Sequence, residues 1–300
     1  PMWAFAALLS ALFLGIYDIF KKLSLNGNAV IPVLFFSTLT STIIFLPVVT
    51  GSLFYPEFFQ SIGLFAPSLT FTEHLHVLLK AVIVVSSWIL AFFAMKHLPV
   101  SIFAPIRSTG PFWTLIGALL IFHEKLNPLQ WLGVSLTLMF FYLFSTAGKK
   151  EGIEFRKNKW IFFIVMATIL GAVSGLYDKF IIKHIDRIAV QAWFSFYQAA
   201  IMFPILLFLW YPKRKNSTPF QWRWTIVAIA VSLVIADFLY FYAISLEGSM
   251  ISMISALRRS SVLLTFTLGA LIFREQNLKQ KGIYLLGILA GILFITLGSR

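Results

Sequence analysis

The chain has 300 residues, of which 59% are hydrophobic, 17% aromatic and 12% charged, and its formal net charge is +13. Soluble domains carry about 25% charged residues, so this composition excludes a soluble globular fold as well as a disordered chain. The chain has no cysteine, which excludes disulfides, thiolate metal sites and cysteine nucleophiles. The positive charge does not indicate nucleic-acid binding, because the lysines and arginines lie between apolar runs of membrane length.

Ten apolar segments follow one another along the chain, each with about the 20 residues that a helix needs to cross a bilayer core of ~30 Å. They cover residues 2–21, 30–50, 77–96, 101–122, 128–147, 159–182, 189–211, 222–245, 249–273 and 280–298. Runs such as Phe140 to Phe144 are apolar on every side, which indicates helices rather than the alternating strands of a barrel. The predicted fold is an all-α integral membrane protein with ten transmembrane helices. Pro99, Pro105 and Pro111 predict a kink or break around the fourth helix.

The chain contains an internal repeat. The six residues from Gly15 to Phe20, with Tyr-Asp at their centre, recur 160 positions later as residues 175–180. Ile-Phe-His-Glu, which ends at Glu124, recurs as Ile-Phe-Arg-Glu, which ends at Glu275. Arg107 and Arg258 each precede the isoleucine of their motif by 14 residues, so the match extends into the helix before it.

These matches predict two five-helix repeats, residues 1–147 and 159–300, joined by a linker at 148–158. An odd number of helices in each repeat places the second repeat upside down in the membrane. Inverted repeats are typical of secondary transporters, whose substrate site lies at the repeat interface near the bilayer midplane. A channel or a membrane enzyme that arose by duplication is the alternative.

Lysine and arginine are unevenly divided between the two sides of the predicted bundle. Most of the 24, with Lys21, Lys22 and Lys281 among them, fall on the side opposite the N-terminus, whereas Lys80 falls on the N-terminal side. By the positive-inside rule, the loops at 148–158 and 212–223 are cytoplasmic and both termini face outward.

With these features the chain resembles the drug/metabolite transporter superfamily, EamA branch. The resemblance is carried by the two halves, by Phe122-His123-Glu124 and Phe273-Arg274-Glu275, and by the stretch from Ser101 to Gly133. It implies a multi-pass carrier of the inner (plasma) membrane, often an exporter. It also implies that helices 1–4 and 6–9 line a central cavity, with helices 5 and 10 at the periphery. The resemblance does not specify a substrate.

Charged residues inside spans are expensive and are functional candidates by default. They are Asp18, Asp178, Asp237, Arg107, Arg258 and Arg259. We expect Arg107 and Arg258 to hold a carboxylate or phosphate of the substrate, and the aspartates to carry a coupling proton. Because neighbours on a helix point about 100° apart, Arg259 is expected to serve in a charge pair instead. The alternative is that Asp–Arg pairs only lock the helices together.

Aromatic residues are candidates for the wall of the cavity. The set is Tyr17, Trp88, Trp113, Tyr177, Trp193, Tyr197, Tyr240 and Tyr242. Tyr17 and Tyr177 stand out because each precedes the repeated aspartate, and Tyr240 lies three residues after Asp237 and so on the same helix face.

Other motifs give weaker signals. Gly287 and Gly291 form a GxxxG that permits close packing within a monomer or in a homodimer. His74 and His76 alone do not indicate a metal site. No nucleophile elbow, Walker loop or zinc-protease motif occurs, so we expect neither an enzyme nor a cofactor.

The sequence therefore predicts a secondary carrier that exports a small polar metabolite, such as an amino acid or another organic anion or zwitterion. A proton gradient or exchange would drive it. A sugar or phosphate-ester exchanger is the alternative among carriers, and a lipid flippase or lipid-processing protein is the alternative from another class. A flippase needs a polar groove open sideways to lipid, whereas a metabolite carrier encloses its path.

Overall fold

The computed structural model describes residues 2–110, 112–113, 116, 127–149, 153–246, 254, 257–274 and 277–298. All regular structure within these ranges is helical, which confirms the all-α expectation for this part of the chain. Much of the fourth and ninth predicted segments falls outside the described residues. The count of ten spans therefore stays a prediction.

Six helices in the described part are long and apolar enough to cross a membrane. They are α1 (Met2–Leu25), α2 (Val30–Phe54), α4 (Phe71–His97), α8 (Lys159–Ile182), α9 (Arg187–Ile205) with its continuation to Lys213, and α10 (Trp224–Ser245). The continuation of α9 is a π turn, η1 (Leu206–Trp210), followed by a 3-10 turn, η2 (Tyr211–Lys213). Helix α4 begins six residues before the expected start, because Thr70 and Glu73 form a capping box ahead of Phe71.

The remaining helices are shorter or flank the bundle. They are α3 (Pro56–Ser61), α5 (Val100–Ser108), α7 (Pro128–Lys149), α12 (Ser261–Phe273) and α13 (Leu278–Gly298). Helix α5 starts directly after Pro99 and ends at Ser108, in agreement with the interruption that the prolines predict there.

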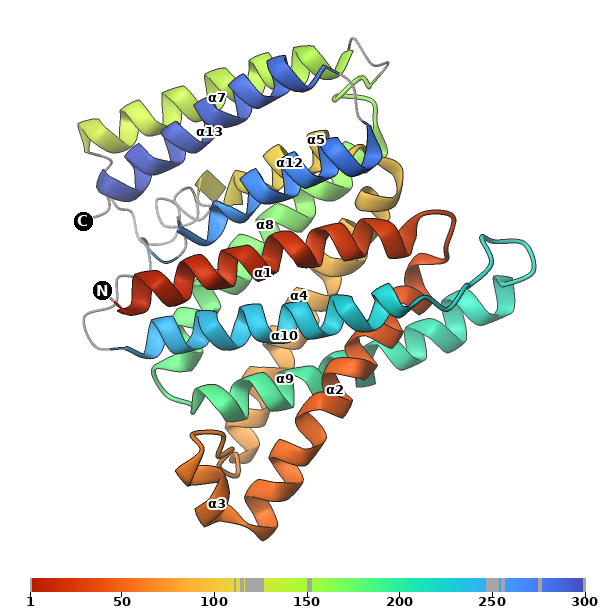
Figure 1. Cartoon of the computed structure of the whole chain (residues 1–300), viewed down its shortest axis with the longest axis vertical. Helices are drawn as coiled ribbons and strands as arrows, with labels where there is room; N and C mark the ends of the chain where they lie inside the picture. The colour runs from red at the N-terminus through yellow and green to blue at the C-terminus, as the bar shows by residue number, and fades with distance from the viewer. Residues whose placement is uncertain are drawn as a thin grey trace.

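The second half of the bundle runs opposite to the first. Lys22 donates hydrogen bonds of 2.7 Å to the carbonyls of Met95 and Leu98, so α1 and α4 end on the same side. His97 at the end of α4 stacks on Trp160 at the start of α8, with ring centroids 3.7 Å apart. Helices α1 and α8, which carry the repeated Tyr-Asp motif, therefore run in opposite directions (Figure 1).

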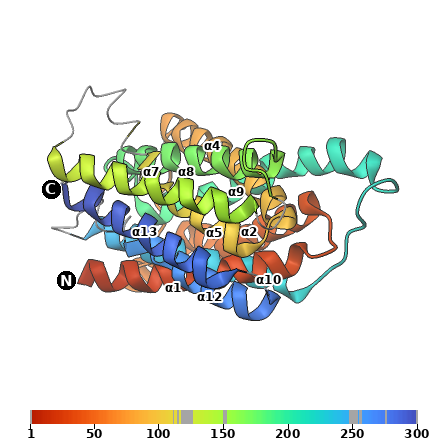
Figure 2. The same cartoon turned by 90° about the horizontal axis from the view of Figure 1, so that it is seen from above.

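Packing interleaves the two halves. Helix α1 of the first half packs along α10 of the second, and α8 of the second packs along α4 of the first. Helix α2 packs against α9, and α7 lies beside α13 at one edge of the bundle (Figure 1, Figure 2). Each of these four pairs joins corresponding or exchanged members of the two repeats, as an inverted two-fold arrangement requires.

The edge pair α7–α13 uses the predicted GxxxG motif. A Cβ atom placed on Gly287 would overlap the ring of Phe140, and one on Gly291 would meet Thr137 and the carbonyl of Gly133. Glycine is therefore needed at both positions for α13 to approach α7 this closely. This face of the motif is occupied within the monomer.

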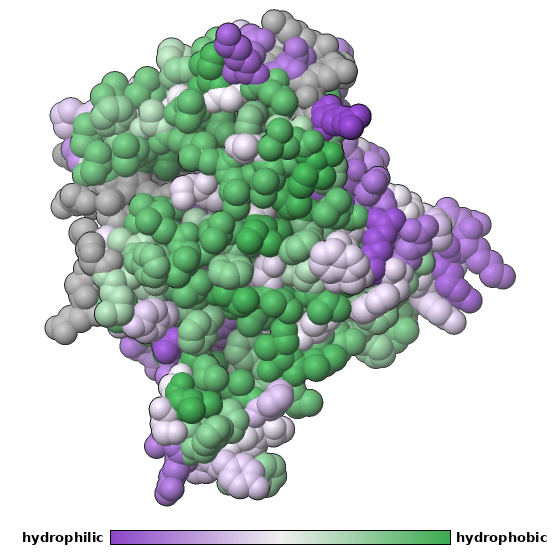
Figure 3. Space-filling view, in the orientation of Figure 1, coloured by the Kyte–Doolittle hydropathy of each residue, from purple (hydrophilic) through white to green (hydrophobic). Residues whose placement is uncertain are grey.

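The outer surface is suited to lipid. Large apolar side chains such as Phe5, Ile43 and Leu286 are more than half exposed. Figure 3 shows apolar residues across most of the visible face, with hydrophilic residues gathered at its right-hand edge, over the segment that connects α9 to α10. This distribution matches an apolar belt with polar ends.

Candidate functional site

Two helices are interrupted at positions that correspond in the two repeats. The helix that begins with α5 is broken at Thr109, and the helix that ends with α12 is broken at Ser260. Arg107 and Arg258 each lie two residues before the break in their repeat. Discontinuous helices in matching positions of inverted repeats mark the substrate site of many secondary transporters.

The two breaks have the same hydrogen bonds. The backbone N–H of Thr109 donates to the carbonyl of Ile106 at 3.2 Å, and that of Ser260 donates to Leu257 at 3.0 Å. The hydroxyls of Thr109 and Ser260 donate to the same two carbonyls, at 2.7 and 2.6 Å. These bonds span three residues rather than four, so each helix is locally tightened where its arginine lies. Ser260 has no proline beside it, and its break follows the repeat rather than a proline signal.

Arg258 contacts three protein side chains. Its Nη2 donates to Asp237 Oδ1 at 2.6 Å, its Nε donates to Ser10 Oγ at 2.9 Å, and its guanidinium lies 4.0 Å from the centre of the Tyr240 ring. Tyr240 shares the Asp237 face of α10, as the spacing predicts.

Arg107 and Arg259 have no carboxylate within 4 Å among the described residues. Arg107 donates one hydrogen bond of 3.0 Å to the carbonyl of Ala167, and the buried Nε of Arg259 has no partner. We expected Arg258 to face the substrate and Arg259 to form the charge pair. The structure places the ion pair on Arg258 instead, because its side chain is the one that reaches Asp237.

The other two aspartates pair with lysines rather than with arginines. Asp18 accepts a 2.6 Å bond from Lys21, one turn along α1, and Asp178 pairs with Lys80 across the α4–α8 contact. All four side chains are at most 15% exposed. The assignment of Lys21, Lys80 and Lys281 to the membrane sides requires correction, because the structure buries all three.

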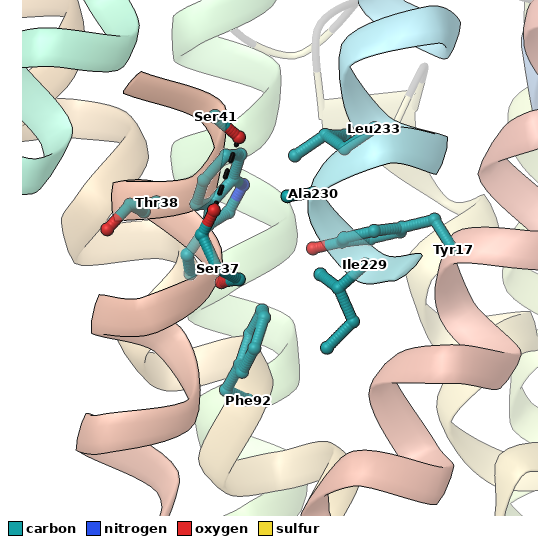
Figure 4. Close-up of a pocket in the computed structure, with 9 residues that line it drawn as sticks. Tyr17, Ser37, Thr38, Ser41, Phe92, Ile229, Ala230 and Leu233 are labelled. Atoms are coloured by element: carbon teal, nitrogen blue, oxygen red, sulfur yellow. Dashed lines mark hydrogen bonds between the residues drawn. The ribbon is translucent and has the colours of Figure 1, made fainter. Parts of the chain in front are cut away.

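A cleft lies among α1, α2, α4 and α10. Its lining includes Tyr17 and Trp88, which the sequence predicts, and Ser37, Thr38 and Ser41, which it does not. Figure 4 shows the Tyr17 ring pointing from α1 across the cleft toward Ser37 and Ser41 of α2. The free space between the lining residues is about enough for one water molecule, far below the roughly 300 Å³ at which ligand sites commonly begin. The cleft must therefore widen to admit a metabolite.

The polar side of this cleft continues into the α2–α9 contact. Thr42 donates to the carbonyl of Ser195 at 2.9 Å, and buried Gln191 and Gln198 on α9 each have one amide atom without a partner. The run Ser-Thr-Leu-Thr-Ser-Thr at 37–42, which is polar at every position except Leu39 and lies inside an apolar segment, was the available sequence signal for this surface.

The remaining predicted aromatics lie away from the cleft. Tyr177 is bonded to His76 at 2.7 Å and Tyr197 to His74 at 2.9 Å, both between the start of α4 and the second half. The Trp193 ring lies against His74, and Tyr242 lies beside Met2, near the N-terminus. Trp113 donates to the hydroxyl of Thr109 and so contacts the first break.

Two sequence candidates are not placed. Glu124 and Glu275, which close the repeated motifs, lie outside the described residues. Among the residues that the structure describes, no group of histidines and carboxylates could hold a metal ion.

The comparisons with known proteins agree with this architecture. The model of the EamA-like transporter family matches residues 1–146 and 158–297. One crystal structure of a protein has the same fold, with a TM-score of 0.63 and 15% sequence identity over 98% of this chain and 95% of that chain. No curated protein sequence matches the chain. Because the family model covers both halves, the chain belongs to the EamA-like transporter family of the drug/metabolite transporter superfamily and is a multi-pass membrane transporter.

Proposed function

We propose that this transporter is a secondary active exporter of small polar metabolites that works by alternating access between its inverted repeats. The observation that carries the proposal is the pair of matching helix breaks, with half-buried arginines at both, beside a cleft between helices of both repeats. Intramembrane charges are costly and are usually retained where they serve binding or coupling, and this position is where inverted-repeat carriers bind substrate.

The lining supports a substrate with both polar and apolar parts. Tyr17 and Trp88 offer ring faces, Ser37 and Ser41 offer hydroxyls, and the arginines nearby favour carboxylates or phosphates. An amino acid or another organic anion or zwitterion fits this chemistry. Four helices surround the cleft, which supports an enclosed path over the lateral groove that a lipid flippase needs.

The orientation is proposed from charge. The side where α1 and α4 end and α8 begins carries Lys22, Lys96 and Lys159, together with the basic segment after η2. This side still has the larger number of lysines and arginines when the buried Lys21, Lys80 and Lys281 are not counted. We therefore propose that it is the cytoplasmic side. Both termini would then face outward across the plasma membrane.

The test is transport by the purified full chain in proteoliposomes. Vesicles are loaded with amino acids, nucleosides, sugars, sugar phosphates or dicarboxylates, and efflux is followed with and without a pH gradient. Efflux that accelerates with the gradient indicates proton coupling, whereas efflux that requires solute on the other side indicates exchange. Equal leakage of every solute from loaded and protein-free vesicles would refute the transporter proposal.

Matched aromatic variants separate the cleft from the lipid-facing surface. Trp88→Phe and Tyr17→Phe alter the lining, whereas Trp131→Phe and Tyr55→Phe alter side chains that are 58% and 70% exposed. We expect the first two to change the KM or the rate of efflux and the second two to leave both unchanged. Identical effects from both sets would remove the cleft from the transport path.

A further inference from the structure

The interior of the described structure carries more positive than negative charge. Three buried or half-buried ion pairs, Asp18–Lys21, Asp178–Lys80 and Asp237–Arg258, account for every aspartate of the predicted charged cluster. Arg107 and Arg259 remain, each half-buried and each without a carboxylate within 4 Å in the described part of the chain. An unpaired guanidinium inside a membrane protein is strongly unfavourable unless an anion joins it.

These two arginines act on the same region. The Arg259 guanidinium packs against the backbone of Gly110, three residues after Arg107. Two like charges that lie this near each other raise the free energy of the empty site. An anion that binds between them removes both the repulsion and part of the desolvation penalty.

Glycines shape the backbone around both guanidinium groups. A Cβ atom on Gly171 of α8 would stand 3.3 Å from Nη1 of Arg107, and one on Gly110 would stand 3.0 Å from Nη2 of Arg259. Each arginine therefore lies flat against a stretch of helix that has no side chain at that point. This seating holds the planar groups in place while their remaining N–H donors stay available, since the structure pairs only one donor of Arg107 and leaves the Nε of Arg259 unpaired.

We infer that Arg107 and Arg259 together bind a substrate group with two negative charges, either a phosphate monoester or a pair of carboxylates. The inference rests on the proposed function and narrows its substrate class. A dianion neutralises both arginines, whereas a monocarboxylate or a zwitterion leaves one buried positive charge uncompensated. Guanidinium groups bind the oxygens of phosphate and carboxylate through paired, planar contacts, so the site accepts either chemistry.

The test is equilibrium binding to the purified full chain in detergent at about pH 8, where phosphate is a dianion. Inorganic phosphate, succinate and acetate are titrated at matched ionic strength, and the melting temperature and heat of binding are recorded. We expect phosphate or succinate to bind about tenfold or more tightly than acetate. Tight binding of phosphate alone assigns the phosphate chemistry, and tight binding of succinate alone assigns the dicarboxylate chemistry.

Variants localise the binding. Arg107→Gln and Arg259→Gln are each expected to weaken dianion binding by about tenfold or more. Arg223→Gln is the matched control, because that arginine contacts the carbonyl of Leu23 and the side chain of Gln221, away from the breaks. If Arg107→Gln fails to fold, Arg107→Lys and Gly171→Ala replace it, and Arg259→Lys replaces Arg259→Gln, since all three keep the charge and alter the contacts of the guanidinium.

The outcomes separate this inference from the transporter proposal. Dianions that bind no more tightly than acetate, or that bind the Arg107 and Arg259 variants as tightly as the wild type, overturn the dianion site. Efflux of a neutral or zwitterionic solute that is insensitive to both variants but sensitive to Trp88→Phe also overturns it, and leaves the transporter proposal standing. Absence of efflux for every solute, with dianion binding intact, refutes the transporter proposal alone.

Discussion

Asp18 and Asp178 occupy the same position in the two repeats, yet they make different ion pairs. Asp18 pairs with Lys21 on its own helix, and Asp178 pairs with Lys80 on a helix of the other half. The first pair leaves the contact between α1 and α10 without an ionic link, whereas the second fastens α8 to α4. The two repeats thus have the same fold but different ion pairs.

The surroundings of the two lysines sharpen the contrast. Lys21 lies over the rings of Tyr17, Phe92 and Phe103, at 4.4 to 5.4 Å from their centres, and Tyr17 and Phe92 line the cleft. Lys80 lies over Phe194 and Phe241, which both belong to the second half. The Asp18 pair therefore lies beside the cleft, and the Asp178 pair lies where the two halves are joined.

The comparison predicts that Lys80→Met destabilises the protein more than Lys21→Met does. Removing Lys80 leaves Asp178, at 9% exposure, as an unpaired buried carboxylate, which costs about 3–5 kcal/mol. Asp18 is 15% exposed and has the Thr265 hydroxyl 3.4 Å away, so the loss of Lys21 costs less. Unfolding free energies measured in detergent or bicelles check the order. The double variant Lys80→Met/Asp178→Leu serves as the control and should recover most of the unfolding free energy that Lys80→Met loses. A double variant as unstable as Lys80→Met would contradict the charge explanation.

Arg258→Gln and Arg259→Gln should change stability in opposite directions in the absence of ligand. Arg258→Gln leaves Asp237, at 19% exposure, without its ion pair and should cost about 2 kcal/mol. Arg259→Gln removes a half-buried charge that has no carboxylate partner in the described structure, so stability should stay the same or rise. Thermal melting without added anions measures both. A loss as large for Arg259→Gln as for Arg258→Gln would mean that Arg259 is paired.

The hydrogen bonds beside the Lys80–Asp178 pair should contribute less. Tyr177→Phe removes the 2.7 Å bond to His76 and should cost about 1 kcal/mol. The rate of solute exchange in proteoliposomes is a second readout. This bond joins α4 to α8 and should slow their separation, so its loss should raise that rate. Tyr55→Phe, an exposed tyrosine on the same side, is the control. An unchanged exchange rate in Tyr177→Phe would show that the two helices do not separate at this point.

The smallest expected effects are at the two breaks. Thr109→Val and Ser260→Ala each remove a hydroxyl that donates to a carbonyl three residues earlier, so each should cost about 0.5–1 kcal/mol. Thr109→Val should cost more, because it also removes the acceptor of the Trp113 indole bond. Melting temperatures of the two variants test this order, and a larger loss in Ser260→Ala would contradict it.

The six long apolar helices of the described part and the two-repeat architecture were readable from the sequence, because long apolar runs and a recurring motif are one-dimensional signals. The break in the fourth predicted helix was also readable, since proline disrupts helical hydrogen bonds. The break at Ser260 carries no such residue and could be inferred only by transferring the first break through the repeat.

Ion pairs were harder to predict. Lys21 stands one turn after Asp18, a spacing that the sequence displays, but its place at the end of an apolar run favoured a loop position. Lys80 and Asp178 are 98 residues apart, and no local pattern relates them. Which of the adjacent residues Arg258 and Arg259 reaches Asp237 depends on the rotation of the helix, and the sequence does not specify that rotation.

Interleaved packing has a consequence for biosynthesis. The main partners of α1, α2, α4 and α7 all belong to the second half, so the first half has few stable contacts of its own when it leaves the ribosome. At about 5–20 residues per second, its helices wait from about 4 s to about 40 s in the bilayer until their partners in the second half are made. The first half is therefore expected to be a target for membrane proteases and chaperones during this interval, and truncation after the first repeat should yield a short-lived product.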